Sequence, residues 1–460
     1  MNRHKAAFIF SVLVLVFSVA VAQESLRPQH PVAFVGGMLL DGYEAQPIHH
    51  SVVVIDDGRI IAAGSNHDTI IPENAVVIDT SGKTVMPGLI DAHVHVDLIG
   101  HGDYDRYYRF LDGMARLNDV MPIAAKQMLR AGVTSAIDLG TPFQILGLRE
   151  SIRKGEIPGP RLTISGPWIT RVYLEGVPDE YQLIINSPRQ AAQRTQELIA
   201  NGSDVIKTWV GLTEDDYRAV VKVAHQHDVK VHAHLYRPVD IRAAIAAGVD
   251  VFQHVGSARN PPYDDELISE IAHKNIPVVQ TIAHRIWIYP ATVAFPERLY
   301  DPVHKKDMPA DIYAEVIDSF KDFHRLSYFH EIGRETRNSK IAARQFIAAG
   351  AYIGVGTDAA SPLNFHTEAM WREMSALVDS GMTPIEVISA ATKTNAEILG
   401  QFDQLGSIES GKFADLIVVD GNPLADINAL RHVNIVVKDG VIWYAEAAAY
   451  GPVTQIGHAF

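Results

Sequence analysis

The chain has 460 residues, of which 47% are hydrophobic and 20% are charged. This composition supports a buried core and excludes a disordered or fibrous protein. Asp and Glu number 54 against 40 Lys and Arg, which gives a net charge of -14 and argues against a nucleic-acid partner. There is no cysteine, so disulfides, thiolate metal sites and cysteine nucleophiles are excluded. Any metal site must therefore use His, Asp, Glu or a modified Lys.

The N-terminus has the pattern of a secretory signal peptide. Arg3 and Lys5 precede an apolar run over 6–17, and the small residues Ala20-Val21-Ala22 follow it. A membrane anchor is the alternative, but the run is shorter than the ~20 apolar residues that a spanning helix needs. We therefore expect a signal peptide over 1–22, with cleavage before Gln23. The mature protein is expected to have no membrane association and to be periplasmic or secreted.

Short β-type runs separated by turn signals occur at both ends of the chain. Ser51–Ile55 is followed by Asp57-Gly58, which is a strong hairpin signal. The same pattern of short apolar runs with turn signals recurs at 415–420 and 433–444. Neither end has enough strands to bury a face alone. We therefore expect 23–85 and 403–460 to pair in one small β-sandwich domain.

Between these ends, residues 86–402 alternate β-type runs with helical stretches. Eight strands are expected at 88–95, 133–138, 161–165, 204–208, 229–234, 249–254, 277–281 and 352–358, with helices such as 188–200, 214–227 and 239–247 between them. This α/β pattern predicts a (β/α)8 TIM-type barrel. A doubly wound sheet is the alternative, but no glycine-rich dinucleotide fingerprint follows any strand. The connection over 282–335 is long and aromatic, which predicts a lid or a binding loop.

Two histidines end the first expected strand of this region. His93 and His95 are two residues apart, so both imidazoles project to the same face of a strand. Barrel enzymes place their chemistry at the carboxyl ends of the strands. The pair is therefore a candidate half of a metal site, although a lone His-x-His is also common by chance.

The motif Pro87-Gly-Leu-Ile-Asp-Ala-His-Val-His95 resembles the opening signature of the amidohydrolase superfamily, and 384–396 with 405–418 resembles its ending. Within the superfamily the chain is most similar to the imidazolonepropionase-like and prolidase-like branch. The resemblance implies a metal-dependent hydrolase that cleaves a C–N amide bond of a small molecule, such as a dipeptide or an N-acyl amino acid.

Three other functions stay open under the same resemblance. They are hydrolysis of a cyclic amide or lactone, deamination, and a non-catalytic protein that keeps the barrel. Deaminases of this type carry a Glu three residues after the histidine of the fifth strand. Here Arg237 follows His234 and Leu235 follows His232 at that spacing, which argues against deamination.

The resemblance also implies a set of metal ligands at successive strand ends. Two divalent ions, with Zn²⁺ expected and Mn²⁺, Co²⁺ and iron as competitors, would be held by His93, His95, Lys207, His234, His254 and Asp358. Carbon dioxide would be bound as a carbamate on Lys207, and Asp358 would be the catalytic proton carrier. His232 is a second candidate in the fifth strand, but the spacing to the following helix selects His234. The family usually has Glu before the next histidine, where this chain has Gln253.

Specificity is expected to come from the loops after the strands. Candidate substrate contacts are Tyr236, His232, Arg171 and Trp168. Aromatic side chains with arginines among them suit a substrate that has an apolar body and a carboxylate. The sequence does not decide the oligomeric state, and a homo-oligomer stays open.

Overall fold

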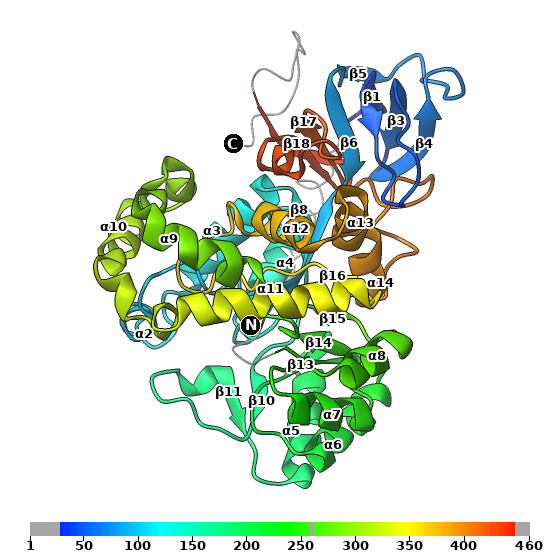
Figure 1. The fold of residues 1–460 in the computed structure, drawn as a ribbon. Coiled ribbons are helices and arrows are strands. Elements are labelled where there is room, and N and C mark those ends of the chain that lie inside the picture. The colour runs from blue at the N-terminus through cyan, green and yellow to red at the C-terminus, as the bar shows by residue number, and fades with distance from the viewer. Residues whose placement is uncertain (1–27, 258–261, 447–460) are drawn as a thin grey trace, which may run out of the picture.

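A computed structural model of the protein describes residues 28–257 and 262–446. The expected signal peptide over 1–22 lies outside these ranges, as does 447–460 of the expected C-terminal domain. Figure 1 shows strands from both ends of the chain together at the top of the view, with the α/β region below them. Within the two described ranges no helix has the length and apolar character needed to cross a bilayer.

Two β-sheets form the upper region. One sheet has the order β4-β3-β1-β5 and the other has the order β19-β18-β17-β6-β2. Side chains from both sheets, among them Phe34, Val53, Val85 and Leu416, share one buried apolar cluster. The strands are β1 (Val32–Val35), β2 (Met38–Leu39), β3 (Ser51–Asp56), β4 (Arg59–Ser65), β5 (Val76–Asp79), β6 (Lys83–Pro87), β17 (Leu416–Asp420), β18 (Val433–Lys438) and β19 (Val441–Ala445).

Strands from the two ends of the chain pair with each other in this region. β17, from the C-terminal part, runs antiparallel to β6 with Leu416 opposite Pro87. β6 therefore continues two residues past the expected domain boundary at residue 85. The hairpin between β3 and β4 turns at Asp57 and Gly58, which have φ values of 42° and 78°. Two successive positive φ values are typical of the tight hairpin turn that Asp-Gly predicts.

The α/β region contains two parallel sheets. The order is β11-β10-β12-β13-β14-β15-β16 in the larger sheet and β7-β8-β9 in the smaller. Backbone hydrogen bonds link the two sheets on both sides, from Asp204 N to Ile164 O at 2.8 Å and from Ala92 N to Val355 O at 3.0 Å. The strands are β7 (Leu89–Val94), β8 (Val133–Asp138), β9 (Arg161–Ile164), β10 (Trp168–Thr170), β11 (Gln182–Ile184), β12 (Val205–Thr208), β13 (Lys230–His234), β14 (Val251–Gln253), β15 (Val278–Val279) and β16 (Ile353–Gly354).

All eight expected strand positions carry a strand, and the expected helices are present. The helix over 188–200 is confirmed as α5, while α6 ends two residues earlier than expected and α7 begins one residue earlier, at Pro238. Proline favours the first helical position because its φ is already helical and its missing N–H is not needed there. The helices are α2 (Tyr104–Phe110), α3 (Leu117–Arg130), α4 (Ile145–Arg153), α5 (Pro188–Ala200), α6 (Glu214–His225), α7 (Pro238–Ala247), α8 (Asp265–His273), α9 (Tyr289–Ala294), α10 (Ala310–Ser319), α11 (Ile332–Ala348), α12 (Ala369–Ser380), α13 (Pro384–Ser389), α14 (Asn395–Leu399), η1 (Asp179–Tyr181), η7 (Ala390–Thr394) and η8 (Ile427–Arg431).

The long connection after β15 is helical, where the sequence predicted a loop. It contains α9, α10, η2 (His284–Ile288), η3 (Pro296–Tyr300), η4 (Pro302–Lys305), η5 (Phe320–Arg325) and η6 (Ser327–Phe329), and it leads into α11, which crosses the centre of Figure 1. Its start is fixed by Glu373 of α12, whose buried carboxyl group accepts hydrogen bonds from Ile282 N at 2.8 Å and Ala283 N at 2.7 Å. The connection is thus an anchored cover and not an irregular loop.

Candidate metal centre and active-site cavity

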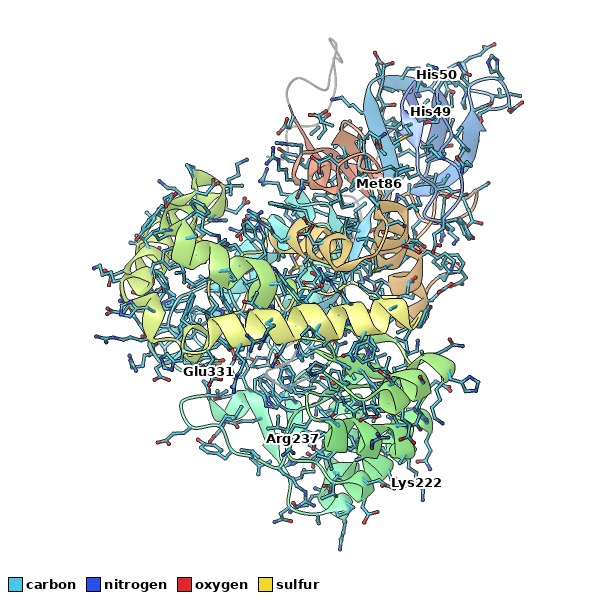
Figure 2. All side chains as sticks on the ribbon, viewed as in Figure 1. His49, His50, Met86, Lys222, Arg237 and Glu331 are labelled. Atoms are coloured by element: carbon cyan, nitrogen blue, oxygen red, sulfur yellow. The ribbon has the colours of Figure 1, made fainter. Side chains whose placement is uncertain are left out.

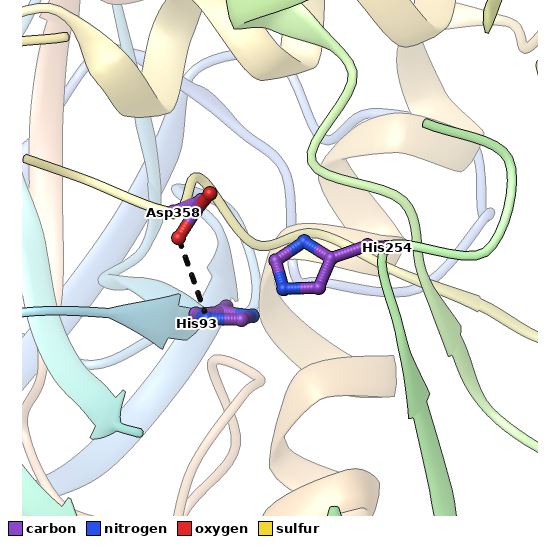
Figure 3. Close-up of side chains that lie close together, drawn as sticks. All are labelled: His93, His254 and Asp358. Atoms are coloured by element: carbon purple, nitrogen blue, oxygen red, sulfur yellow. Dashed lines mark ion pairs between the residues drawn. The ribbon is translucent and has the colours of Figure 1, made fainter. Parts of the chain in front are cut away.

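Nitrogen and oxygen ligands meet at the carboxyl ends of the parallel strands. His93 lies in β7, His254 directly follows β14, and Asp358 lies four residues after β16. One potential ligand atom from each of these three side chains lies within 4.8 Å of the other two. Figure 3 shows the three side chains facing one another. Strand ends that are far apart in the sequence therefore supply one compact group of ligands.

The remaining expected ligands surround this group. Asp358 Oδ1 lies 3.5 Å from His93 Nε2 and 3.2 Å from His95 Nε2. The His254 ring centre is 4.5 Å from that of His93 and 4.5 Å from that of His234. Lys207, in β12, lines the same cavity. The structure thus brings all six expected ligands together.

Two of the candidate ligands are held in an unusual backbone conformation. His254 has a φ of 69° and Asp358 has a φ of 53°. The left-handed region costs a residue other than glycine ~1–3 kcal/mol and is frequent at functional sites. Backbone hydrogen bonds hold both residues there, from His254 N to Val279 O at 2.7 Å and from Asp358 N to His93 O at 2.8 Å. The surrounding strands therefore maintain a strained arrangement that directs two ligands into the cluster.

Burial sets the charge of these groups. It lowers the pKa of His234 to about 3 and the pKa of His93 well below its usual value, and the nearby Lys207 charge lowers both further. Both rings are thus neutral near pH 7, as metal ligation requires. Burial alone would raise the pKa of Asp358, but the hydrogen bond from His95 and the charge of that ring hold the pKa of Asp358 well below its usual value. Asp358 is therefore ionised.

Lys207 is a buried lysine whose amine has no hydrogen-bond partner among the described residues. Its side chain is 1% exposed, and burial lowers its pKa from 10.5 to about 7 against the attraction of Asp358 and Asp138. Neither Lys207 Nζ nor His93 Nε2 has a hydrogen-bond partner within the described part of the chain. Buried nitrogens without partners, neutral imidazoles and an ionised carboxylate fit divalent metal ions, so the residues present suit the metals that the sequence led us to expect.

The two histidines of β13 have different surroundings. His234 lines the cavity, and its ring lies 5.1 Å from the Trp209 ring. His232 does not line the cavity, and its Nδ1 lies 3.0 Å from Gln253 Nε2. These positions favour His234 as the ligand and His232 as a hydrogen-bonding residue inside the sheet.

The ligands form one wall of a cavity of about 430 Å³. A cation lines the same cavity. The buried Arg285 directs Nη1 to Ser257 Oγ at 3.1 Å and Nη2 to Tyr236 OH at 3.5 Å, and Nη1 also contacts His284 Nε2. Nε of Arg285 lies 3.5 Å from Glu335 Oε2. The full lining is His93, His95, Tyr104, Leu174, Lys207, Trp209, His234, Tyr236, His254, His284, Arg285, Tyr289, Tyr328, Asp358 and Ser361. The cavity therefore combines a ligand cluster, a positive charge and several tyrosines.

Three expected substrate residues, His232, Arg171 and Trp168, do not line this cavity. Arg171 instead binds Asp216 through two hydrogen bonds, Nε to Oδ2 at 2.6 Å and Nη2 to Oδ1 at 3.0 Å. Trp168 is buried behind Trp209, with ring centres 4.2 Å apart. The expected contact at Tyr236 does line the cavity. Arg171 thus anchors the start of α6, and Trp168 supports the cavity wall from behind.

Other lining residues were missed by sequence reasoning. Tyr328, Leu174 and Ser361 belong to segments without a recognisable motif. Tyr328 lies in η6, deep inside the long connection, so only the length and aromatic content of that connection hinted at a role. His284 begins the same connection, and its Nε2 lies 3.9 Å from Asp358 Oδ2.

These features define a class, an α/β protein with its candidate site at the carboxyl ends of parallel strands. The sequence profile of the Amidohydrolase family matches residues 84–443, which is most of the chain. The chain therefore belongs to the amidohydrolase family, and it is a hydrolase.

Individual relatives agree with this assignment. Ochratoxinase of Aspergillus niger is 25% identical over 465 residues, which cover 90% of this chain and 86% of that protein. A solved structure of a candidate prolidase from Bifidobacterium longum has 29% identity and a TM-score of 0.70, covering 90% of this chain and 95% of the other. A 5-methylthioadenosine/S-adenosylhomocysteine deaminase of Symbiobacterium thermophilum is 23% identical over 416 residues, or 82% of each chain. The solved relatives indicate an α/β fold of the TIM-barrel type.

Proposed function

We propose that the protein is a metal-dependent amidohydrolase that cleaves the C–N amide bond of a small substrate bearing a carboxylate, such as a dipeptide or an N-acyl amino acid. The observation that carries the proposal is the group of neutral imidazoles, the ionised Asp358 and the buried Lys207 at one end of the parallel strands. In this proposal the eight central strands close into a (β/α)8 barrel, and the two sheets from the chain ends form a β-sandwich.

The chain's own residues would hold two divalent ions, with Zn²⁺ preferred. They are His93, His95, Lys207 as its carbamate, His234, His254 and Asp358. Bound divalent ions would lower the pKa of a shared water from ~16 toward ~7. Asp358 accepts the proton of the attacking water at its carboxylate and delivers it to the leaving nitrogen. Protonation matters because an amide nitrogen leaves poorly without it.

The cavity suits a substrate with an apolar body and one negative charge. Its volume of about 430 Å³ lies in the usual range for small-molecule sites. Tyr236, Tyr289 and Tyr328 offer aromatic faces, and Arg285 offers a guanidinium that matches a carboxylate. Because Arg285 and the candidate ligands line the same cavity, a carboxylate bound to Arg285 would hold the amide of a small substrate near the metals.

Amide hydrolysis is favoured over deamination by the residue three positions after the end of β13. Arg237 stands where a deaminase of this type has Glu, and Figure 2 shows its position. Arg237 is exposed and pairs with Asp240, with Nε 2.7 Å from Oδ2. It therefore provides no carboxyl group for moving a proton in the cavity.

The proposal extends to where the protein acts. The pattern over 1–22 supports export, so the enzyme would meet its small-molecule substrate in the periplasm or outside the cell. Mass measurement of the exported protein should give a chain that starts at Gln23. A chain that retains residues 1–22 would contradict export by this signal.

The test is metal analysis together with a substrate screen. Purified protein is stripped of metal, reloaded with Zn²⁺ and assayed against dipeptides, N-acyl amino acids, lactams, lactones and aminopurines. We expect about two ions per chain and release of an amino acid from an N-acyl substrate only in the loaded protein. His234→Ala should lose metal, while His232→Ala serves as the matched control and should keep it. A chain that binds no metal, or that releases ammonia from aminopurines, would contradict the proposal.

A further inference from the structure

A buried glutamine bridges two histidines behind the candidate metal centre. Gln253 is the last residue of β14, and its side chain is fully buried. Its Oε1 lies 2.8 Å from His93 Nδ1, and its Nε2 lies 3.0 Å from His232 Nδ1. The same Nε2 lies 3.5 Å from the carbonyl oxygen of Ala92. One amide thus contacts an expected ligand, a histidine that does not line the cavity, and the backbone of β7.

The two ends of an amide have opposite hydrogen-bonding roles. Oε1 only accepts, so His93 must carry its hydrogen on Nδ1, which leaves the lone pair on Nε2. Nε2 only donates, so His232 Nδ1 must accept, and the hydrogen of that ring lies on its Nε2. The contact with the Ala92 carbonyl agrees with this orientation, because a carbonyl oxygen needs a donor. Opposite tautomers of the two rings therefore follow from one side chain.

We propose that Gln253 is a positioning residue that sets these tautomers and thereby makes His93 a metal ligand and His232 a non-ligand. The inference rests on the proposed metal-dependent function. His93 Nε2, the nitrogen left with the lone pair, is the one that faces Asp358 Oδ1 at 3.5 Å. In the opposite amide orientation His93 would carry hydrogen on that nitrogen and could not bind a cation through it.

A carboxylate at this position would act differently. Glutamate accepts hydrogen bonds through both oxygens, so His93 would keep its tautomer while His232 would change to the form with hydrogen on Nδ1. A hydroxyl is also less selective, because it both donates and accepts. His254 illustrates this, since its Nδ1 contacts Thr281 Oγ1 at 2.8 Å and that hydroxyl can satisfy either tautomer. The amide is thus the group that distinguishes the two rings.

The test compares Gln253→Met and Gln253→Glu with a matched control, Gln280→Met. Gln280 is 1% exposed and follows β15, and its amide atoms have no hydrogen-bond partner within the described ranges. Zn²⁺ affinity is measured by competition with a chelator. The tautomers are read from ¹⁵N shifts of labelled histidine in the metal-free protein. His93→Ala and His232→Ala assign the signals.

We expect Gln253→Met to lose ~10–100-fold in Zn²⁺ affinity and the fixed tautomer of His93, with Gln280→Met unchanged. Gln253→Glu should keep the His93 tautomer, invert that of His232 and bind Zn²⁺ more tightly than Gln253→Met. If Gln253→Met does not fold, the His232 signal of Gln253→Glu decides. An unchanged His93 tautomer and wild-type affinity in Gln253→Met, or an unchanged His232 tautomer in Gln253→Glu, would overturn the role of Gln253. A wild-type chain that binds no Zn²⁺ would instead overturn the proposed function, and the tautomers of the metal-free protein would still test Gln253.

Discussion

Replacing Lys207 by methionine should stabilise the metal-free protein in a way that depends on pH. Burial lowers the pKa of Lys207 from 10.5 to about 7, so between these values the unfolded chain binds a proton that the folded chain does not. The free energy of unfolding therefore rises with pH across this window. At ~1.4 kcal/mol for each unit of pKa, the folded protein is destabilised by about 5 kcal/mol below pH 7.

The stabilisation by Lys207→Met should thus be largest in mild acid. It should be about 5 kcal/mol near pH 6 and about 2 kcal/mol near pH 9, because at the higher pH only the part of the destabilisation that arises between pH 9 and the unfolded pKa of 10.5 remains. Methionine also changes the packing, but that contribution is the same at both pH values. The fall of about 3 kcal/mol between the two is therefore the diagnostic quantity.

The assay is urea unfolding of metal-free protein in buffers without bicarbonate, so that no carbamate forms. Lys222→Met is the matched control, because Lys222 is an exposed lysine on α6, which Figure 2 places on the lower part of the molecule. The effect of Lys222→Met on the free energy of unfolding should not vary with pH to this extent. A Lys207→Met effect that stays constant from pH 6 to pH 9 would refute the reasoning, because Lys207 would then keep an ordinary pKa in the folded chain.

Three further substitutions test the proposed site. Asp358→Asn keeps an oxygen ligand but removes the proton carrier. Metal analysis should find the ions largely retained, while turnover should fall ~10²-fold or more. Unchanged turnover would remove Asp358 from the mechanism. Arg285→Gln should lower kcat/KM ~10–100-fold for a substrate with a free carboxylate and leave its amidated analogue unaffected; equal losses for both substrates would count against a carboxylate site. Gly356→Ala would place a Cβ 2.9 Å from His93 N and 2.5 Å from Val279 Cγ1. Competition with a chelator should therefore show that Zn²⁺ affinity falls ~10-fold or more. Wild-type Zn²⁺ affinity would show that the strands accommodate the added methyl group.

The positions of two candidate ligands could be predicted because they depend on strand periodicity. His93 and His95, two residues apart at the end of an apolar run, required only that the run be a strand. The Asp57-Gly58 turn followed from local turn chemistry in the same way. The resemblance to the family then supplied Lys207 and Asp358, which periodicity alone would not have distinguished from an ion-paired lysine and a helix cap. Local rules and family motifs thus identified the candidate ligands that lie in strands or soon after them.

The substrate side could not be predicted equally well, because it depends on contacts between distant segments. Arg171 was expected to contact the substrate, but Asp216 binds Arg171 away from the cavity, and no sequence pattern predicts that ion pair. The helices of the long connection were missed for a related reason. Their order depends on tertiary anchors such as Glu373, which contributes from α12.

The ligands and the substrate-facing side chains have different structural support, and this difference has a consequence for specificity. His93 and Asp358 are fixed by hydrogen bonds within and between neighbouring strands. Arg285 and Tyr289 instead belong to the connection whose start, at Ile282 and Ala283, donates hydrogen bonds to Glu373. The two sets meet where His284 Nε2 lies 3.9 Å from Asp358 Oδ2, but they are anchored separately, so substitutions in the connection should change which substrate is accepted while the metals stay bound. The distant identity to proteins named as an ochratoxinase and a deaminase is compatible with this separation. One arrangement of strand ends can serve several substrates when the cover above it differs.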